Sequence, residues 1–354
     1  MDKVERGVRS LERVSTIREI AAVLRVDAAA LLGRDVQPVG VAERREGVAR
    51  IRAALSAYPM AFGRPADREV MSPDRLAREV RHAWMTFQHA RYPRLVELLP
   101  PVVTEVHRAH AQDPQTRRAT VVEAYRVTAA LLVKLDEGSL SWLAADRAMS
   151  AAAGDRVLLA CAAVQLGQAL RASARAGPVM LAAASQIASG APEEISLRGS
   201  LLVQAGLIAA RAGDDRVVGE LLDETAELAD QVGDGHDHYR TAFGPTAVEL
   251  ARVAAAVELG DGPQAVARHE EAMGRDGWRW LPVEHRAAHL IDAARAYLLT
   301  DDPANAARVL LRADRIAPAE IRDRPAARGV VAQVACDPDA PSTITQLAIG
   351  LGML

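Results

Sequence analysis

Apolar residues recur three and four positions apart along most of this chain, which is the spacing of one face of an α-helix. The apolar stretches repeatedly end in Gly followed by Asp, at Gly154-Asp155, Gly213-Asp214 and Gly260-Asp261. Thr300-Asp301-Asp302 is a degenerate form of this ending. A Gly just past a helix supplies the left-handed cap conformation, and the following Asp can cap the next helix. Repetition at intervals of roughly forty to sixty residues predicts a stack of helical hairpins.

Six helical pairs are expected after Ser72-Pro73-Asp74, where Pro suits a first helical position. We expect Pro100-Pro101 to break or kink the second of these helices. The predicted pairs are 73–92 with 95–110, 118–135 with 141–153, 156–176 with 179–189, 197–212 with 217–232, 246–259 with 264–273, and 284–299 with 303–317. Segments 324–334 and 342–351 are predicted as capping helices. The fold class is therefore all-α, with six or so hairpins curving into a right-handed superhelix that has a concave inner face.

The N-terminal part divides in two. Residues 1–33 contain two short amphipathic helical patterns. Residues 34–72 are punctuated by Pro and Gly and read as a linker with one helix, within 41–58. Residues 73–354 form the predicted repeat domain.

Composition agrees with closely packed helices. Hydrophobic residues make up 50% of the chain but aromatic residues only 3%, and Ala and Leu supply most of the difference. No segment approaches the roughly 18 uninterrupted apolar residues of a membrane span, and the N-terminus has no apolar signal core. We expect a cytoplasmic protein.

Charge and cysteine content exclude few classes of function. The net charge of -3 gives no global signature of nucleic-acid binding, and the only lysines are Lys3 and Lys134. Cys161 and Cys336 are far apart in sequence; reduced, helix-buried thiols are favoured over a disulfide.

No catalytic motif is present. The chain lacks a GxSxG elbow, a P-loop and a dinucleotide fingerprint, so we expect neither an enzyme nor a cofactor. His285 with His289, His107 with His110, and the turn 234–238 have spacings that a metal could use, but solvated or capping roles are favoured.

Several polar and aromatic residues are candidates for a ligand or peptide groove on the concave face. Arginine offers a planar fork to a carboxylate, and aromatic side chains offer apolar contact. The candidates are Trp142, Asp146, Arg147, Tyr239, Arg240, Phe243 and Thr246. Two alternatives stay open: Asp146, Arg147 and Arg240 could form ion pairs between repeats, and helical spacing favours core packing for Trp84 and Trp142. The run Trp278-Arg279-Trp280 lies between predicted helices and could line a surface groove.

The N-terminal residues carry a family resemblance. Val4-Glu5-Arg6-Gly7, Ile20-Ala21 with Leu24 and Val26, and Leu31-Leu32 resemble the second half of the helix-turn-helix domain of phage-repressor-type (xenobiotic-response-element) regulators. The resemblance implies that Met1 lies inside the recognition helix and that Lys3, Arg6 and Arg9 face DNA. Since the first two helices would be missing, DNA binding by this chain should be poor. The alternative is a plain amphipathic cap on the repeats.

Residues 75–354 resemble the helix-turn-helix regulators of antibiotic-producing filamentous bacteria that have a C-terminal tetratricopeptide-like sensor. The matching runs are Trp84–Tyr92, Trp142–Ala148, Tyr239–Thr246, Arg315–Glu320 and the terminal LeuGlyMetLeu. In that family Phe-Gly-Pro-Thr is usually followed by Asn and, four residues on, by His. This chain has Ala247 and Ala251 there, so two polar groups of the family's pocket are absent, which leaves the ligand and the response to it open.

Two functions follow as hypotheses. The first is a transcriptional regulator whose repeat domain binds a small signal or peptide and mediates homodimerisation, through the terminal helices or the Trp278 loop. The second is an adaptor that does not bind DNA and whose groove holds a partner protein.

Overall fold

The chain is all-helical wherever the structure describes it. The computed structural model describes residues 39–56, 71–113, 117–173, 175–188, 190–338 and 340–353, and these contain sixteen α-helices, two short 3₁₀ turns and no strand. The N-terminal segment 1–33, with its predicted helix-turn-helix half, lies outside the described residues. The first ten helices are α3 (Val39–Leu55), α4 (Pro73–Gln88), α5 (Tyr92–Gln112), α6 (Arg118–Lys134), α7 (Gly138–Ala151), α8 (Arg156–Ala169), α9 (Ala176–Ser185), α10 (Pro192–Arg211), α11 (Asp215–Val232) and α12 (Pro245–Leu259).

The remaining helices complete the chain to its C-terminal end. They are α13 (Gly262–Gly274), α14 (Val283–Leu299), α15 (Pro303–Ile316), α16 (Pro318–Arg322), α17 (Pro325–Ala335) and α18 (Ser342–Gly350). The 3₁₀ turn η3 (His238–Arg240) precedes α12, and η4 (Asp276–Trp280) precedes α14.

The Gly-Asp endings do what the sequence predicts. Gly154, Gly213 and Gly260 have φ of 86°, 77° and 80°, the left-handed region that glycine enters without a steric penalty. The Asp that follows each one accepts a hydrogen bond from a backbone N–H in the first turn of α8, α11 or α13. At the degenerate ending, Asp302 caps α15 in the same way. The helix boundaries therefore follow from local chemistry.

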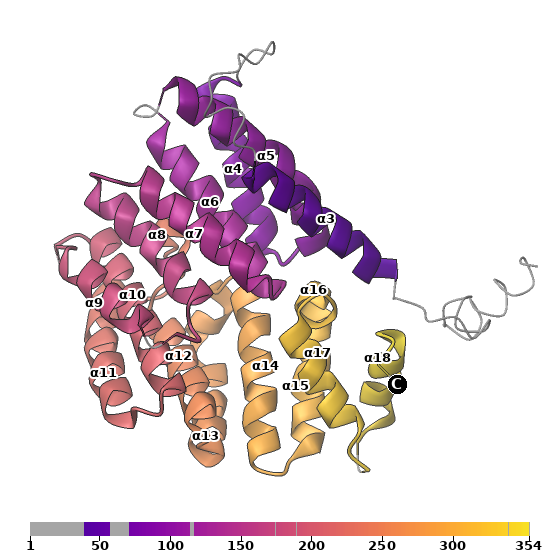
Figure 1. Cartoon of the computed structure of the whole chain (residues 1–354). Coiled ribbons are helices and arrows are strands. Elements are labelled where there is room, and N and C mark those ends of the chain that lie inside the picture. Colours follow the sequence, from indigo (N-terminus) through magenta and orange to yellow (C-terminus); the bar gives the residue numbers. More distant parts are fainter. Residues whose placement is uncertain are drawn as a thin grey trace, which may run out of the picture.

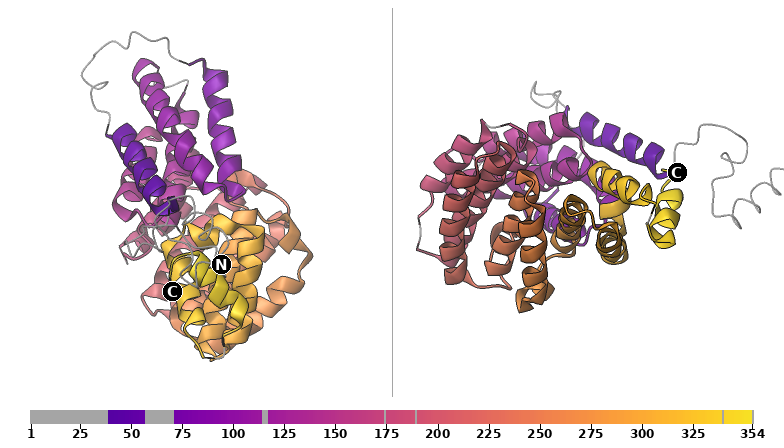
Figure 2. Two further views of the ribbon diagram at one scale, coloured as in Figure 1. Left: turned by 90° about the vertical axis from the view of Figure 1, so that its right-hand side faces the viewer. Right: turned by 90° about the horizontal axis from the view of Figure 1, so that it is seen from below.

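The helices follow one another around an arc (Figures 1 and 2). Each helix from α4 to α15 contacts the next, and the even-numbered helices α4, α6, α8, α10, α12 and α14 also contact one another in that order. Helix α14 contacts α4 as well, so the even-numbered helices meet again where the arc returns on itself. We call these six helices the inner helices.

Small residues allow the helices of a pair to approach closely. Ala144, Ala145 and Ala148 of α7 are fully buried, and so are Ala306 and Ala307 of α15. Because an alanine adds only one carbon beyond the backbone, neighbouring helices make contact near their axes. The scarcity of aromatic residues is thus a packing property of the fold.

The structure differs from the sequence expectations at three places. Of the break or kink expected at Pro100-Pro101, the break does not occur: helix α5 is continuous, because its apolar face is buried against α3, α4 and α6 and this packing outweighs two missing backbone donors. The helix predicted over 156–176 ends at Ala169, and α9 begins at Ala176. Of the two free cysteines, Cys161 is buried as expected, but Cys336 is exposed.

Helix α3, in the predicted linker, packs on α5. Its Arg44 Nη1 donates a hydrogen bond to the carbonyl oxygen of Asp323, 2.9 Å away, which ties α3 to the C-terminal helices. None of the helices in the described ranges is both long and apolar enough to span a membrane.

Candidate functional site

Two adjoining cavities lie among the inner helices. The first, of about 240 Å³, is lined by residues of α4, α6, α8, α10, α12 and α14 and by the loop before α12. The second, of about 560 Å³, shares eight lining residues with the first and extends toward Arg211, Glu258 and Arg295. We call the two together the central cavity. The shared residues are Val133, Lys134, Gln168, Arg171, Leu207, Ala254, Asp292 and Arg324.

One wall of the central cavity is apolar. Trp84 and Phe87 of α4 meet edge to face, with ring centroids 5.8 Å apart, and both are buried. Phe243 and Leu250 complete the wall from the α12 side. Phe243 rests directly on the backbone of Gly199 in α10, where a Cβ atom would lie only 2.1 Å from the ring. The absence of a side chain at position 199 therefore sets the position of this aromatic residue.

The opposite part of the cavity carries charge. Six basic residues line it, and five of them make ion pairs: Lys134, Arg211, Arg240, Arg295 and Arg324. Arg171 makes no ion pair with the described part of the chain. Its Nη2 donates to Gln204 Oε1 at 2.9 Å, and its buried Nε has no hydrogen-bond partner. Burial lowers the pKa of Arg171, Asp292 counteracts this, and Arg324 and Arg211 lower the pKa further.

A buried ionic cluster lies at the point where the arc returns on itself. Lys134 Nζ is 2.5 Å from Glu284 Oε1 in α14 and 2.8 Å from Glu320 Oε1 in α16. Glu320 also accepts hydrogen bonds from the Tyr92 hydroxyl and from Arg324 Nη1. Burial raises the pKa of Glu284, but His285 and Lys134 outweigh burial and hold it well below its usual range. The cluster joins α6 to α14 and α16 with every charge paired.

The loop between α11 and α12 lines one end of the cavity, and the backbone of this loop is strained. Tyr239, Arg240 and Ala242 have φ of 51°, 61° and 48°, a region that residues with a Cβ rarely adopt. The fully buried Arg126 holds this loop: its Nη2 donates to the Tyr239 carbonyl at 2.8 Å and its Nε donates to Gln165 at 2.7 Å. Strained conformations of this kind persist only where surrounding contacts enforce them, and they concentrate at functional sites.

His289 lines the cavity on its α14 side and is paired with His269. His269 Nδ1 is 2.9 Å from His289 Nε2, and the Nδ1 atom of His289 is buried without a partner. Burial, followed by His269 and Arg312, lowers the pKa of His289 to about 3. Burial, followed by Arg312 and Arg308, lowers the pKa of His269 to about 4. Both rings are therefore neutral near pH 7.

Of the groove candidates expected from the sequence, Arg240 and Phe243 line the central cavity. Tyr239 lies next to them and packs against the core of α8 to α12. Thr246 is fully buried in the first turn of α12, where its Oγ1 donates to Asp234 Oδ2 at 2.7 Å and its N–H to Asp234 Oδ1 at 3.0 Å, so the Asp234 carboxylate caps this helix.

The other three groove candidates, Trp142, Asp146 and Arg147, lie on α7 and do not line the cavity. Trp142 is 46% exposed, so core packing is wrong for this residue but correct for Trp84. Arg147 Nη1 is hydrogen-bonded to His107 Nε2 at 3.0 Å. Arg240 pairs with Asp237 within its own turn, so this ion pair is local and does not join two repeats. Of the tryptophans in η4, Trp278 is buried and Trp280 is exposed.

Ala247 and Ala251, the two positions at which the sequence departs from the pattern it resembles, both line the central cavity. Lys3, Arg6 and Arg9, expected to face DNA, lie outside the described residues. Arg171, the lining cation without an ion pair among the described residues, was not predicted from the sequence as a site residue. It lies in the turn after α8, within the segment predicted as continuous helix, and no motif marks it.

Two of the histidines weighed as possible metal ligands make other contacts. His285 Nδ1 is 2.8 Å from Glu284 Oε2, and His289 bonds to His269. Among the described residues, no three His, Cys, Asp or Glu side chains gather where they could hold a metal ion.

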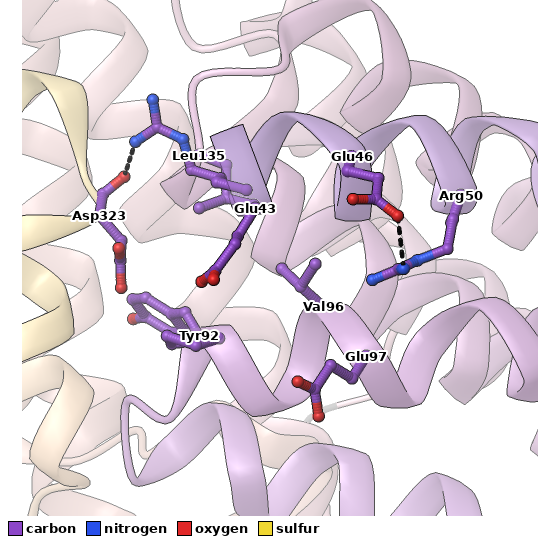
Figure 3. Close-up of a pocket in the computed structure, with 10 residues that line it drawn as sticks. Glu43, Glu46, Arg50, Tyr92, Val96, Glu97, Leu135 and Asp323 are labelled. Carbon is purple, nitrogen blue, oxygen red and sulfur yellow. Dashed lines mark hydrogen bonds and ion pairs between the residues drawn. The ribbon is translucent and has the colours of Figure 1, made fainter. Parts of the chain in front are cut away.

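A further cavity of about 320 Å³ is lined by residues of α3, of α5 and of the α16–α17 turn (Figure 3). Glu43 points into it between Tyr92 and Val96, and Glu46 pairs with Arg50 at 3.1 Å on its rim. Since Tyr92 also contacts Glu320, this cavity is separated from the ionic cluster by one side chain.

Comparison with known proteins gives no family for this chain: no family model matches it, and neither a curated protein nor a solved structure does.

Proposed function

We propose that this chain is the sensor and dimerisation part of a helix-turn-helix transcriptional regulator. Its helical pairs form a tetratricopeptide-like right-handed superhelix, and its central cavity binds a small signal or a peptide. The observation that carries this proposal is that all six inner helices line one cavity. A repeat array that uses its inner helices in this way presents a concave binding surface built by the whole domain.

Two features support binding over a purely structural cavity. The loop at residues 239–242 keeps a strained backbone next to the cavity, and strain of this kind concentrates at functional sites. The cavity is also lined by Arg171, which makes no ion pair with the described part of the chain. An anionic ligand would give this guanidinium a charged partner.

The regulatory part of the proposal depends on the N-terminal resemblance. Helix α3 follows the segment that resembles the helix-turn-helix and is tied to the α16–α17 turn through Arg44. The same turn contributes Arg324 to the cavity. A ligand that shifts this turn would therefore change the position of α3. In a dimer it would also change the spacing of the two DNA-binding domains.

The test is a DNA-binding measurement across a salt series, on DNA from upstream of the coding sequence. It compares this chain with a form that carries two further helices before the recognition helix. We expect only the longer form to bind, with affinity falling steeply as salt rises. Sedimentation of the same samples should show a dimer. Failure of both forms to bind, together with specific capture of a protein partner, would favour the adaptor.

A further inference from the structure

We propose that the ligand of the central cavity is a monocarboxylate with an apolar body, and that Arg171 binds its carboxylate. This inference rests on the proposed sensor function and specifies the ligand's chemistry. Most charged side chains of the cavity are already paired, and an apolar wall lies opposite them.

Arg171 is the place in the lining where an added negative charge would meet a cation without a carboxylate partner. The cavity is lined by six lysine and arginine residues, by His285, which pairs with Glu284, and by four acidic residues, Asp136, Glu258, Glu284 and Asp292. Five of the basic residues have carboxylate partners, so Arg171 is the basic side chain of the lining that an incoming anion would meet unpaired. A guanidinium offers a carboxylate a planar fork of N–H donors, and the hydrogen bond that Arg171 does make, from Nη2 to Gln204 Oε1, is to a neutral group.

The neighbouring groups favour a singly charged ligand. Asp292 and Glu284 line the same cavity and would repel a second negative charge. A phosphate monoester carries close to two charges at pH 7, but the lining has only one unpaired cation to oppose them. A carboxylate matches that count.

The apolar wall determines the rest of the ligand. Trp84, Phe87, Phe243 and Leu250 are buried in the protein and line the cavity. The one polar atom in these four side chains, Trp84 Nε1, is buried without a hydrogen-bond partner. The two adjoining spaces have a combined size within the roughly 300–1,000 Å³ typical of small-molecule sites. An aliphatic or aromatic body of several carbons can occupy this space while the carboxylate reaches Arg171.

Calorimetric titration of the purified chain tests the inference with matched pairs of probes. Decanoate and indole-acetate are compared with their neutral primary amides, which have the same shape and no charge. N-acetyl-dileucine with a free C-terminus is compared with its amidated form, so that a free organic acid is distinguished from a peptide terminus. We expect at least one acid to bind about tenfold or more tightly than its amide.

The variants assign the effect to Arg171. In Arg171→Gln the preference for acid over amide should disappear, and in Arg171→Lys it should be partly retained. The control is Arg175→Gln, which changes an exposed arginine of the same turn and should leave binding unchanged. Equal affinity for acid and amide, an unchanged preference in Arg171→Gln, or no binding of any acid would overturn the inference. None of these three outcomes depends on DNA binding. A negative titration would therefore refute the carboxylate ligand without refuting the regulator, which the DNA-binding measurement tests.

Discussion

Lys134 in α6 and Glu320 in α16 form an ion pair, with Nζ and Oε1 2.8 Å apart and Glu320 fully buried. Because the same ammonium group binds Glu284, one lysine pairs with two buried carboxylates where the arc of helices returns on itself. The pair therefore fixes the C-terminal helices against the first half of the domain and holds one side of the central cavity.

Replacing this lysine should destabilise the fold strongly. In Lys134→Met the apolar stem is retained, but two buried carboxylates lose a cation, and we expect the free energy of unfolding to fall by about 3 kcal/mol at pH 7. Urea denaturation measures the change. The matched control is Arg94→Met, which breaks an exposed pair with Glu97 and should cost less than about 1 kcal/mol. Equal losses in the two variants would mean that the cluster does not hold the two halves together.

The contact between Gly199 and Phe243 gives a second prediction. In Gly199→Ala the new methyl group would overlap the Phe243 ring, so the ring must move or the helices separate, at a cost of about 1–3 kcal/mol. Gly219, within α11, has open space where a Cβ would lie. Gly219→Ala should therefore stabilise the protein by up to about 1 kcal/mol through helix propensity. Thermal unfolding distinguishes the two signs, and stabilisation by both substitutions would contradict the packing described for Phe243.

Acid should destabilise the protein through His289. Its pKa is about 3 in the folded state, so below the unfolded value of about 6.5 the unfolded chain takes up a proton that the folded chain does not. The stabilising effect of the neutral ring is complete above pH 7.5 and falls by about 2 kcal/mol by pH 5.

Urea unfolding at pH 7.5 and pH 5 checks this. His289→Gln, whatever its stability at pH 7.5, should lose about 2 kcal/mol less than the original chain on acidification. His82→Gln, which changes an exposed histidine, should keep the original dependence. An identical slope in all three proteins would show that His289 is not held neutral by burial.

The helices were predictable from sequence because their ends are local. The left-handed Gly and the capping Asp at Gly213-Asp214 and Gly260-Asp261 need only their own neighbours, and the structure has both helix ends at these positions. A break or kink was predicted at Pro100-Pro101, and no break occurs there because packing of α5 outweighs a local preference.

The site was predictable only in part. Arg240 and Phe243 belong to a recognisable run and do line the cavity. Arg171 and Lys134 acquire their significance from partners far away in sequence: one is left unpaired by a closed ring of helices, and the other is paired with α14 and α16. No periodicity in the sequence encodes either relationship. Trp142 looked like a groove residue, but it lies exposed on α7, which is not an inner helix.

The measurement that tests the central claim most directly is hydrogen exchange of the whole chain with and without a saturating amount of the acid that binds it most tightly in the titration. The account predicts slower exchange around Arg171, in the loop from Tyr239 to Phe243 and along α14, with α11 and α13 unchanged and the effect absent in Arg171→Gln. Unchanged exchange in the inner helices, or protection confined to α11, α13 and the exposed face of α7, would contradict a ligand site in the central cavity.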